Sequence, residues 1–396
     1  MRKAAAGVVI GGAMTGAAAL LAAVYFARQI VVPASRRVED LPILRVFRDN
    51  TASLLIELPA SPRTTVPGRY SIWFANGAGH ACIGKIVATD DGACPAAVGT
   101  VTRLVERVDS GDLLSAKAGI WSGYVYPTPD PLGLPYKDVG IPVDNGMAPA
   151  WQFPPSDASP GDSGTWALHV HGLGGKKSGA LRGVPVAGRL GYTSLVVSFR
   201  NDGEAPASAD GRYHLGQSEW RDVDGAVSYA LDQGASQIVL FGWSLGGTIA
   251  LQLTLESEFR DRIAGLVLDA PVIDWTSTLM ANARSSKLPR WIAALGLRIL
   301  ESPRLCWIAG LGTALNLGAL DGVERAGELR LPALVIHSER DRSTPFAVSR
   351  RFVDRRPDIA TLVTFPSVEH TQEWNIDPEG WDGAVFAWLR NRVQSG

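Results

Sequence analysis

The sequence predicts an α/β protein: a mainly parallel sheet with helices on both faces, preceded by a small β-rich domain. Three observations predict this fold class. From about residue 150 onward, short apolar runs alternate with segments of helical periodicity, the pattern of strand–helix–strand units. Within this region, a strand pattern passes directly into a helix pattern through the glycine-rich residues 242–247. Residues 41–149 instead hold short β-like runs separated by Gly, Pro, Asp and Asn.

The glycine-rich turn carries the strongest chemical signal. Gly242-Trp243-Ser244-Leu245-Gly246 fits the pattern Gly-x-Ser-x-Gly, with an apolar β-forming run at 237–241 before it and an apolar helical pattern at 248–255 after it. Glycines let such a strand-to-helix turn close tightly, and the serine at its apex is then held clear of the sheet. Ser244 is therefore the expected nucleophile.

A serine nucleophile needs a base, and the base needs a carboxylate to orient it. The C-terminal third supplies both in the order serine, acid, histidine that accompanies such an elbow. Asp341 follows the strand pattern at 334–337, and His370 follows the strand pattern at 361–365. We expect Asp341 as the acid and His370 as the base. Three other carboxylates are alternatives for the acid: Glu339, Asp269 and Asp274.

The expected oxyanion hole comes from an earlier segment. The strand pattern at 166–170 runs into His171-Gly172-Leu173-Gly174-Gly175, where glycines allow backbone amides to approach a developing negative charge. We expect the donors to be the amides of Leu173 and Leu245. No Gly-Lys-Ser/Thr or Gly-x-Gly-x-x-Gly pattern and no metal-type Cys/His spacing is present in the sequence, so neither a cofactor nor a metal is expected.

With these motifs, the chain resembles a known family. Residues from about 150 to 396 are similar to the α/β-hydrolase superfamily, in the branch of esterase-type and prolyl-oligopeptidase-type serine hydrolases. Four segments are similar to actinobacterial members: 198–206, 219–223, 269–275 and 369–378. The resemblance implies the α/β-hydrolase fold and a triad of Ser244, Asp341 and His370. The chain has no room for the seven-bladed propeller of the related peptidases.

The expected function is hydrolysis of carboxylic (acyl) esters through an acyl-enzyme on Ser244, with a small-molecule or lipid-like acyl substrate. A serine peptidase, an acyltransferase and a non-catalytic envelope interaction protein are the alternatives. Between 275 and 329, apolar helical patterns replace the alternation, at the place where these enzymes carry a lid. An apolar lid favours a hydrophobic substrate, whereas the alternative is that these residues form the insertion's own core. A net charge of −1 without a basic stripe excludes nucleic acid as an expected partner.

The N-terminal segment predicts a membrane anchor. Residues 4–27 carry no charge and are long enough to span a bilayer. Because no good cleavage site follows Tyr25-Phe26, a transmembrane signal anchor over 1–32 is favoured over a cleaved signal peptide. The membrane is thus an expected partner through this helix. The expected location is membrane-anchored, with an extracytoplasmic enzyme as one option and a secreted one if the helix is cleaved.

We expect the hydrolase domain over residues 150–396. The remaining expectations concern the region between the anchor and this domain. The β-rich domain over 41–149 is expected to pack on the hydrolase and wall one side of the cleft, with recognition of an envelope component as the alternative. The proline-rich residues 123–160 predict an extended connection. Cys82 and Cys94 could form a disulfide in an oxidising compartment, and three unpaired thiols are an equal alternative.

Overall fold

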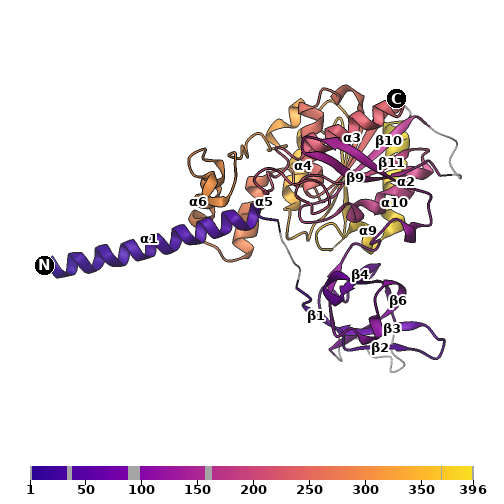
Figure 1. Cartoon of the computed structure of the whole chain (residues 1–396), viewed down its shortest axis with the longest axis horizontal. Helices are drawn as coiled ribbons and strands as arrows, with labels where there is room; N and C mark the ends of the chain where they lie inside the picture. Colours follow the sequence, from indigo (N-terminus) through magenta and orange to yellow (C-terminus); the bar gives the residue numbers. More distant parts are fainter. Residues whose placement is uncertain (1, 34–37, 88–98, 157–162, 367, 395–396) are drawn as a thin grey trace.

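The computed structural model describes residues 2–33, 38–87, 99–156, 163–366 and 368–394, with side chains from residue 16 onward. Two separate sheets and a long N-terminal helix make up the architecture (Figure 1). The smaller sheet is formed by the first third of the chain, and the larger sheet with its helices by the remainder.

The larger sheet has eight strands, and its central strand leads to Ser244. In spatial order the strands are β15 (Ala360–Phe365), β14 (Ala333–Ser338), β13 (Ile263–Asp269), β12 (Gln237–Trp243), β10 (Thr165–Val170), β11 (Thr193–Val197), β9 (Gly146–Phe153) and β8 (Lys137–Val143). The six strands from β15 to β11 are parallel, and the β8–β9 hairpin adds antiparallel to the β11 edge. Continuous burial along β10, β11 and β14 reflects coverage of both faces, as expected of parallel strands.

Helices cover both faces of this sheet. One hydrophobic cluster includes residues of α3 (Trp220–Asp232), α4 (Leu245–Glu256) and α8 (Phe346–Arg355), and a second cluster includes residues of α2 (Val184–Arg189) and α10 (Pro378–Arg392). A short helix α9 (Glu373–Ile376) precedes α10. The predicted α/β fold, with a mainly parallel sheet and helices on both faces, is confirmed.

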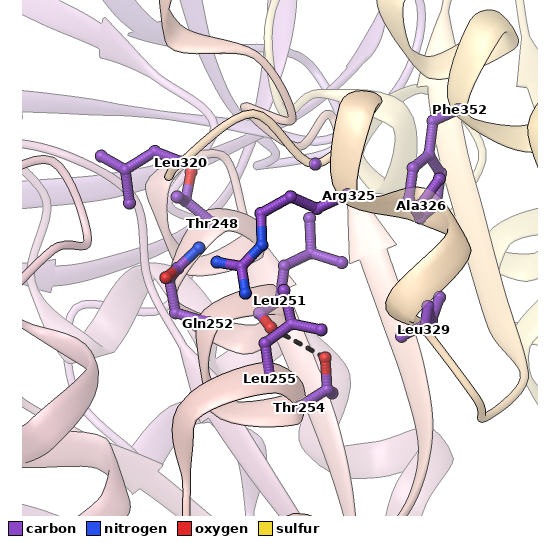
Figure 2. A pocket seen from close by; sticks show the side chains of 11 residues that line it. Thr248, Leu251, Gln252, Thr254, Leu255, Leu320, Arg325, Ala326, Leu329 and Phe352 are labelled. Atoms are coloured by element: carbon purple, nitrogen blue, oxygen red, sulfur yellow. Dashed lines mark hydrogen bonds between the residues drawn. The ribbon is translucent and has the colours of Figure 1, made fainter. Parts of the chain in front are cut away.

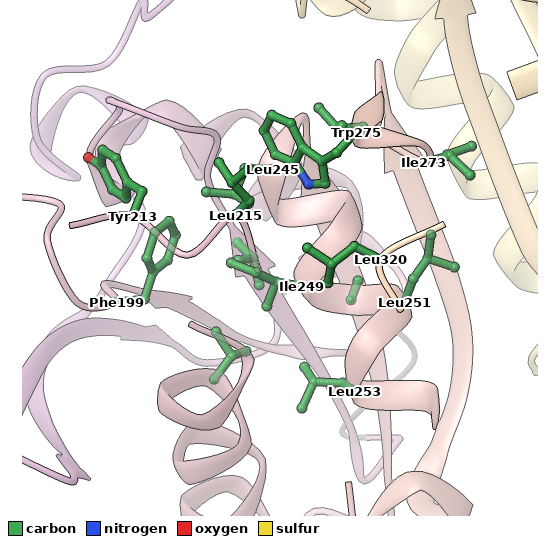
Figure 3. Packing of buried hydrophobic residues seen from close by; sticks show 14 of the residues in the cluster. Phe199, Tyr213, Leu215, Leu245, Ile249, Leu251, Leu253, Ile273, Trp275 and Leu320 are labelled. Atoms are coloured by element: carbon green, nitrogen blue, oxygen red, sulfur yellow. The ribbon is translucent and has the colours of Figure 1, made fainter. Parts of the chain in front are cut away.

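Helix α4 is the packing centre behind the elbow. Its apolar residues are buried on every side, and this is why the segment shows little amphipathic pattern. Figure 3 shows Leu245 and Ile249 beside Leu215, Trp275 and Leu320, which come from segments far apart in the sequence. A helix held this firmly supplies a rigid base for the residue at its N-terminus, Ser244.

The smaller sheet has seven antiparallel strands. Their spatial order is β1 (Leu41–Pro42), β7 (Ala118–Ser122), β4 (Tyr70–Phe74), β5 (Gly79–Ile86), β6 (Thr100–Ser110), β3 (Leu54–Pro59) and β2 (Arg45–Arg48). The amide of Ile43 donates to Lys117 O and the amide of Leu44 donates to Glu57 O, so the chain after β1 bridges β7 and β3. The sheet therefore curls into an open barrel around its own apolar core, and the predicted separate β-rich domain is present.

The two sheets divide earlier in the chain than the sequence suggests. The barrel ends at Ser122, whereas β8 and β9 already belong to the large sheet. The expected boundary at residue 149 falls within β9, because proline-rich sequence tolerates an edge hairpin as well as an extended connection. Cys82 is buried in the barrel, and the disulfide considered for it concerns Cys94, which lies outside the described residues.

The region from 275 to 329 forms a helical insertion. It contains α5 (Trp275–Ser285), α6 (Arg290–Glu301) and α7 (Cys306–Ala309). Its buried residues, Leu279, Ile292 and Leu300 among them, belong to the same hydrophobic cluster as α4. These buried side chains therefore pack together with the core behind α4, whereas Trp291 and Trp307 of the same insertion are exposed, and the role of the insertion as a lid stays a prediction.

Helix α1 (Arg2–Val31) corrects the expected membrane anchor. Ala23, Ala27 and Val31 are fully buried where the end of the helix lies against α6 and α7 (Figure 1). A Cβ on Gly296 would lie 3.0 Å from Ala23 O, so the two helices pack backbone to backbone. Among residues 2–33 and the other described segments, no helix combines the length and the apolar character needed to cross a bilayer. The expected single-helix anchor and the membrane location based on it are therefore wrong.

Candidate active site

The turn at Ser244 has the strain expected of a nucleophile elbow. Ser244 has φ 54° and ψ −114°, a conformation that side chains rarely adopt. A Cβ on Gly242 would lie 2.5 Å from Gly246 O, and one on Gly246 would lie 2.1 Å from Val170 O. Only glycine fits at both positions, and this explains the sequence pattern around the serine.

The structure brings the three predicted catalytic side chains into contact. His370 Nε2 lies 2.8 Å from Ser244 Oγ, and His370 Nδ1 lies 2.7 Å from Asp341 Oδ2. Each side chain stands at the carboxyl end of a parallel strand: Ser244 after β12, Asp341 after β14 and His370 after β15. Carboxyl ends of neighbouring parallel strands meet at one edge of the sheet, so residues 126 positions apart come together there.

Asp341 is held as a carboxylate. Its Oδ1 accepts hydrogen bonds from the amides of Ser343 (2.7 Å) and Thr344 (2.9 Å), and its Oδ2 also faces His337 Nε2 at 3.2 Å. Burial by itself would raise the pKa of Asp341, but the hydrogen bonds and charges of His337 and His370 outweigh it and hold the pKa well below its usual range. In a serine–histidine–acid arrangement, an ionised carboxylate in this position can stabilise a positively charged imidazole ring.

The other carboxylates considered for the acid are occupied elsewhere. Glu339 is exposed and lies 4.0 Å from Arg350. Asp274 caps α5 by accepting a hydrogen bond from the amide of Ser277. Asp269 accepts a hydrogen bond from Trp381 Nε1 at 2.7 Å beneath the site. None of the three has a described hydrogen bond to His370.

A cavity of about 330 Å³, counted with its open mouth, lies beside Ser244 and His370. Leu173 lines it, and the amide of Leu245 lies in the first turn of α4, where backbone N–H groups have no acceptor within the helix. The remaining lining residues are Tyr124, Gly172, Gly179, Arg182, Trp243 and Thr371. The helical insertion contributes none of these lining residues.

Sequence reasoning did not find Tyr124 or Arg182. Tyr124 lies in the connection after the β-barrel and carries no motif, and Arg182 lies in a short 3-10 helix, Lys177–Gly183. Buried Arg182 donates from Nη1 to Thr371 O at 2.8 Å and to Asn375 Oδ1 at 2.7 Å. The arginine therefore holds the turn that follows His370.

A second cavity lies beside the C-terminal half of α4, away from the triad (Figure 2). Leu251, Leu255 and Phe352 supply much of its wall, and Arg325 reaches across it. Thr254 uses its hydroxyl to donate to Leu251 O at 2.7 Å. The residues that line this cavity include no histidine and no carboxylate that could activate a hydroxyl group. The cavity is therefore not a site for the chemistry expected of Ser244.

Beneath the triad, Asp269 and Glu373 form a buried carboxyl pair. Both residues are almost fully buried, and one oxygen of each carboxyl, Asp269 Oδ1 and Glu373 Oε2, has no hydrogen-bond partner among the described residues. Glu373 Oε1 accepts from the amide of Ser338 at 2.9 Å. Burial first, and then the charge of Asp269, raise the pKa of Glu373 well above its usual value. We infer that Glu373 keeps a proton and donates it to Asp269.

We therefore predict that Glu373→Gln changes how stability depends on pH. Because the folded-state pKa of Glu373 is raised, the folded protein binds this proton over a pH range where the unfolded chain has lost it. The unfolding free energy of the wild type then falls as pH rises above about 4.3, by about 1.4 kcal/mol for each pH unit up to the folded pKa. Glutamine can donate to Asp269 and accept from Ser338 without titrating.

Urea unfolding of both proteins from pH 5 to pH 8 measures this effect. The unfolding free energy of Glu373→Gln is expected to gain on that of the wild type as pH rises. The exposed Glu339→Gln variant is the control and is expected to follow the wild type. A difference between Glu373→Gln and wild type that stays constant over the range would exclude a shared proton.

Comparison with known proteins agrees with this architecture. The sequence model of the Alpha/beta hydrolase family matches residues 167–381, more than half of the chain. The protein therefore belongs to the α/β-hydrolase family. Residues 42–122, the β-barrel, match a domain of unknown function, DUF8805. No curated protein matches the chain.

Solved structures show the same fold. The Pyrococcus furiosus esterase Pf2001 is 20% identical, with a TM-score of 0.51 in one crystal form, covering 67% of this chain and 94% of that one. Another crystal form of that esterase gives a TM-score of 0.50 and covers 67% and 96%. A Xanthomonas campestris α/β serine hydrolase without a lid is 15% identical, with a TM-score of 0.47, covering 65% and 95%. At these identities the likeness concerns the fold.

Proposed function

We propose that this protein is a serine hydrolase that cleaves carboxylic esters through an acyl-enzyme on Ser244. One observation carries the proposal: the continuous contact from Ser244 Oγ to His370 Nε2 (2.8 Å) and from His370 Nδ1 to Asp341 Oδ2 (2.7 Å). A serine, a base in reach of its hydroxyl and a buried acid that orients the base form the arrangement required for nucleophilic catalysis.

The chemistry follows from these positions. Ser244 Oγ attacks the ester carbonyl while His370 Nε2 takes the serine proton, and the amides of Leu173 and Leu245 bind the oxyanion. His370 then gives the proton to the departing alkoxide, so an alcohol leaves and the acyl group stays on Ser244. Water, deprotonated by His370, attacks the acyl-enzyme and releases the carboxylic acid and free Ser244. No step requires a cofactor.

Two observations support catalysis over a non-catalytic interaction role. The cavity beside Ser244 is open, and none of the residues lining it comes from the insertion. The triad contacts are within hydrogen-bond distance, whereas a degenerate site would have no reason to keep the strained φ of Ser244.

Mass spectrometry and ester kinetics together test the proposal. The protein is incubated with p-nitrophenyl acetate and, separately, with a fluorophosphonate probe, and the modified peptide is identified. Turnover of the ester, with phosphonylation on Ser244, is the expected result. Cleavage of a matched peptide amide with a kcat/KM close to that of the ester would assign the site to a peptidase, and labelling at another residue would overturn the assignment of the nucleophile.

A further inference from the structure

One wall of the catalytic cavity comes from outside the hydrolase sheet. Tyr124 lines the cavity together with Ser244 and His370, yet it lies two residues after β7 of the β-barrel. Its ring packs on bare backbone: a Cβ on Gly175 would lie 2.5 Å from Tyr124 Oη, and one on Gly179 would lie 2.5 Å from Tyr124 Cζ. Tyrosine and glycines are thus matched in shape at this contact.

The β-barrel holds the backbone of Tyr124. The carbonyl of Tyr124 accepts a hydrogen bond from Ser71 Oγ at 2.8 Å and faces His80 Nε2 at 3.1 Å. Ser71 and His80 are both fully buried in the barrel. His80 Nδ1 in turn lies 2.6 Å from Asp109 Oδ2, so each ring nitrogen of His80 faces an oxygen acceptor.

The same junction is tied to the turn after His370. Asn375 is fully buried and donates from Nδ2 to Arg69 O (2.6 Å) and Gly123 O (2.9 Å). Its Oδ1 accepts from Arg182, which also holds Thr371 O. The barrel is therefore fixed against the hydrolase at Arg69 and at Gly123, the residue directly before Tyr124.

The position of the ring also indicates which part of a substrate it meets. His370 protonates the departing alcohol, so the alcohol lies toward the His370 turn. Tyr124 packs instead on the segment 175–179, which follows the expected oxyanion residue Leu173. Room for a bound group is small, because only about 50 Å³ of this cavity can be reached by the centre of a water molecule.

We propose that the β-barrel contributes to the active site by positioning Tyr124, and that Tyr124 determines which acyl groups the active site accepts. The ring closes the acyl side of the cavity, so the enzyme takes esters of short carboxylic acids. This inference rests on the proposed ester hydrolysis. It gives the domain of unknown function a role in substrate selection, in contrast to the expectation of a lipid-like substrate under an apolar lid.

The test uses the full chain and a series of p-nitrophenyl esters from acetate to dodecanoate. Wild type is expected to show the highest kcat/KM on the shortest acyl groups. Tyr124→Ala opens the wall and is expected to raise the ratio of kcat/KM for octanoate to that for acetate at least about tenfold. Tyr124→Leu should give a smaller rise, and Tyr124→Phe, which keeps the ring, should stay within about twofold of wild type.

Tyr126→Ala is the matched control. Tyr126 lies on the same segment but packs on Trp374 with ring centroids 6.2 Å apart, and it does not line the cavity. Its substitution is expected to leave the octanoate-to-acetate ratio unchanged. Equal shifts in Tyr124→Ala and Tyr126→Ala would show that loosening of the segment, and not the wall, changes specificity, and would overturn the inference.

Ser71→Ala tests the part played by the barrel. It removes one donor to the Tyr124 carbonyl without touching the cavity, and it is expected to raise the same ratio in the direction of Tyr124→Ala, by a smaller factor. A ratio equal to that of wild type would show that the barrel does not set the position of Tyr124.

A second readout separates failure of this inference from failure of the proposed function. Methyl and dodecyl fluorophosphonates react by forming a bond between Ser244 Oγ and phosphorus, with loss of fluoride, independently of ester turnover. Wild type is expected to react faster with the short probe, and Tyr124→Ala to lose that preference. Labelling with the expected preference but without ester turnover would reject the esterase proposal alone. Ester turnover with an unchanged chain-length ratio in Tyr124→Ala would reject only the role of Tyr124.

Discussion

Ser244→Ala is expected to lower kcat for a short acyl ester by about a million-fold, the scale seen when a serine nucleophile is removed from a triad. Without the hydroxyl, His370 has no proton to accept and no acyl-enzyme can form. Residual hydrolysis would come from substrate binding and from the amides of Leu173 and Leu245. Steady-state kinetics measures the loss, and labelling by a fluorophosphonate is expected to disappear with it.

Ser343→Ala is the matched control for this experiment. Ser343 is an exposed serine close to the triad, and its backbone amide, which donates to Asp341, survives the substitution. Its activity is expected to remain within a few-fold of wild type. Activity or labelling retained in a folded Ser244→Ala protein, as judged by its melting temperature, would place the nucleophile elsewhere.

Asp341→Asn is expected to lower kcat by about ten-thousandfold with the fold retained. Asp341 Oδ1 faces two backbone amides, so the amide oxygen of an asparagine is held there and its NH2 group turns toward His370 Nδ1. His370 then carries its proton on Nε2, pointing at Ser244, and cannot accept the proton of the serine. The imidazolium also loses the negative charge that stabilises it.

The other carboxylates provide the controls. Glu339→Gln alters an exposed side chain and is expected to leave kcat within about twofold of wild type. Asp274→Asn is expected to act through the cap of α5, on stability and not on kcat. A loss of kcat in either variant as large as that in Asp341→Asn would contradict the assignment of the acid.

The strand, turn and helix around Ser244 were predictable because they depend on residues that are adjacent in the chain. The turn at Ser244 leaves no room for a side chain at positions 242 and 246, so both must be glycine. This requirement is visible within five adjacent residues of the sequence. The strand before Ser244 and the helix after it follow from apolar periodicity, and the sequence places them within three residues of the observed ends of β12 and α4. Signals of this kind depend on neighbours in the chain, so sequence reasoning reaches them.

Features that depend on distant partners were not predictable in the same way. An uncharged run at the N-terminus is compatible with burial in a bilayer and with burial against another part of the protein. Only the packing of α1 against α6 shows that Ala23 and Ala27 are buried within the protein. Likewise, β8 and β9 join the large sheet because the edge of β11 is free to pair with β9. No local sequence pattern predicts this pairing.

The sequence by itself determined the fold class, the elbow and the chain order of the proposed nucleophile, acid and base, because these rest on backbone sterics and on the direction of parallel strands. Only the tertiary structure decided which carboxylate meets His370, that Asp269 and Glu373 are buried together beneath the site, and that a tyrosine of the β-barrel junction lines the cavity beside Ser244. Each of these is a contact between segments far apart in the chain, and its geometry is set by the packing of whole sheets and helices.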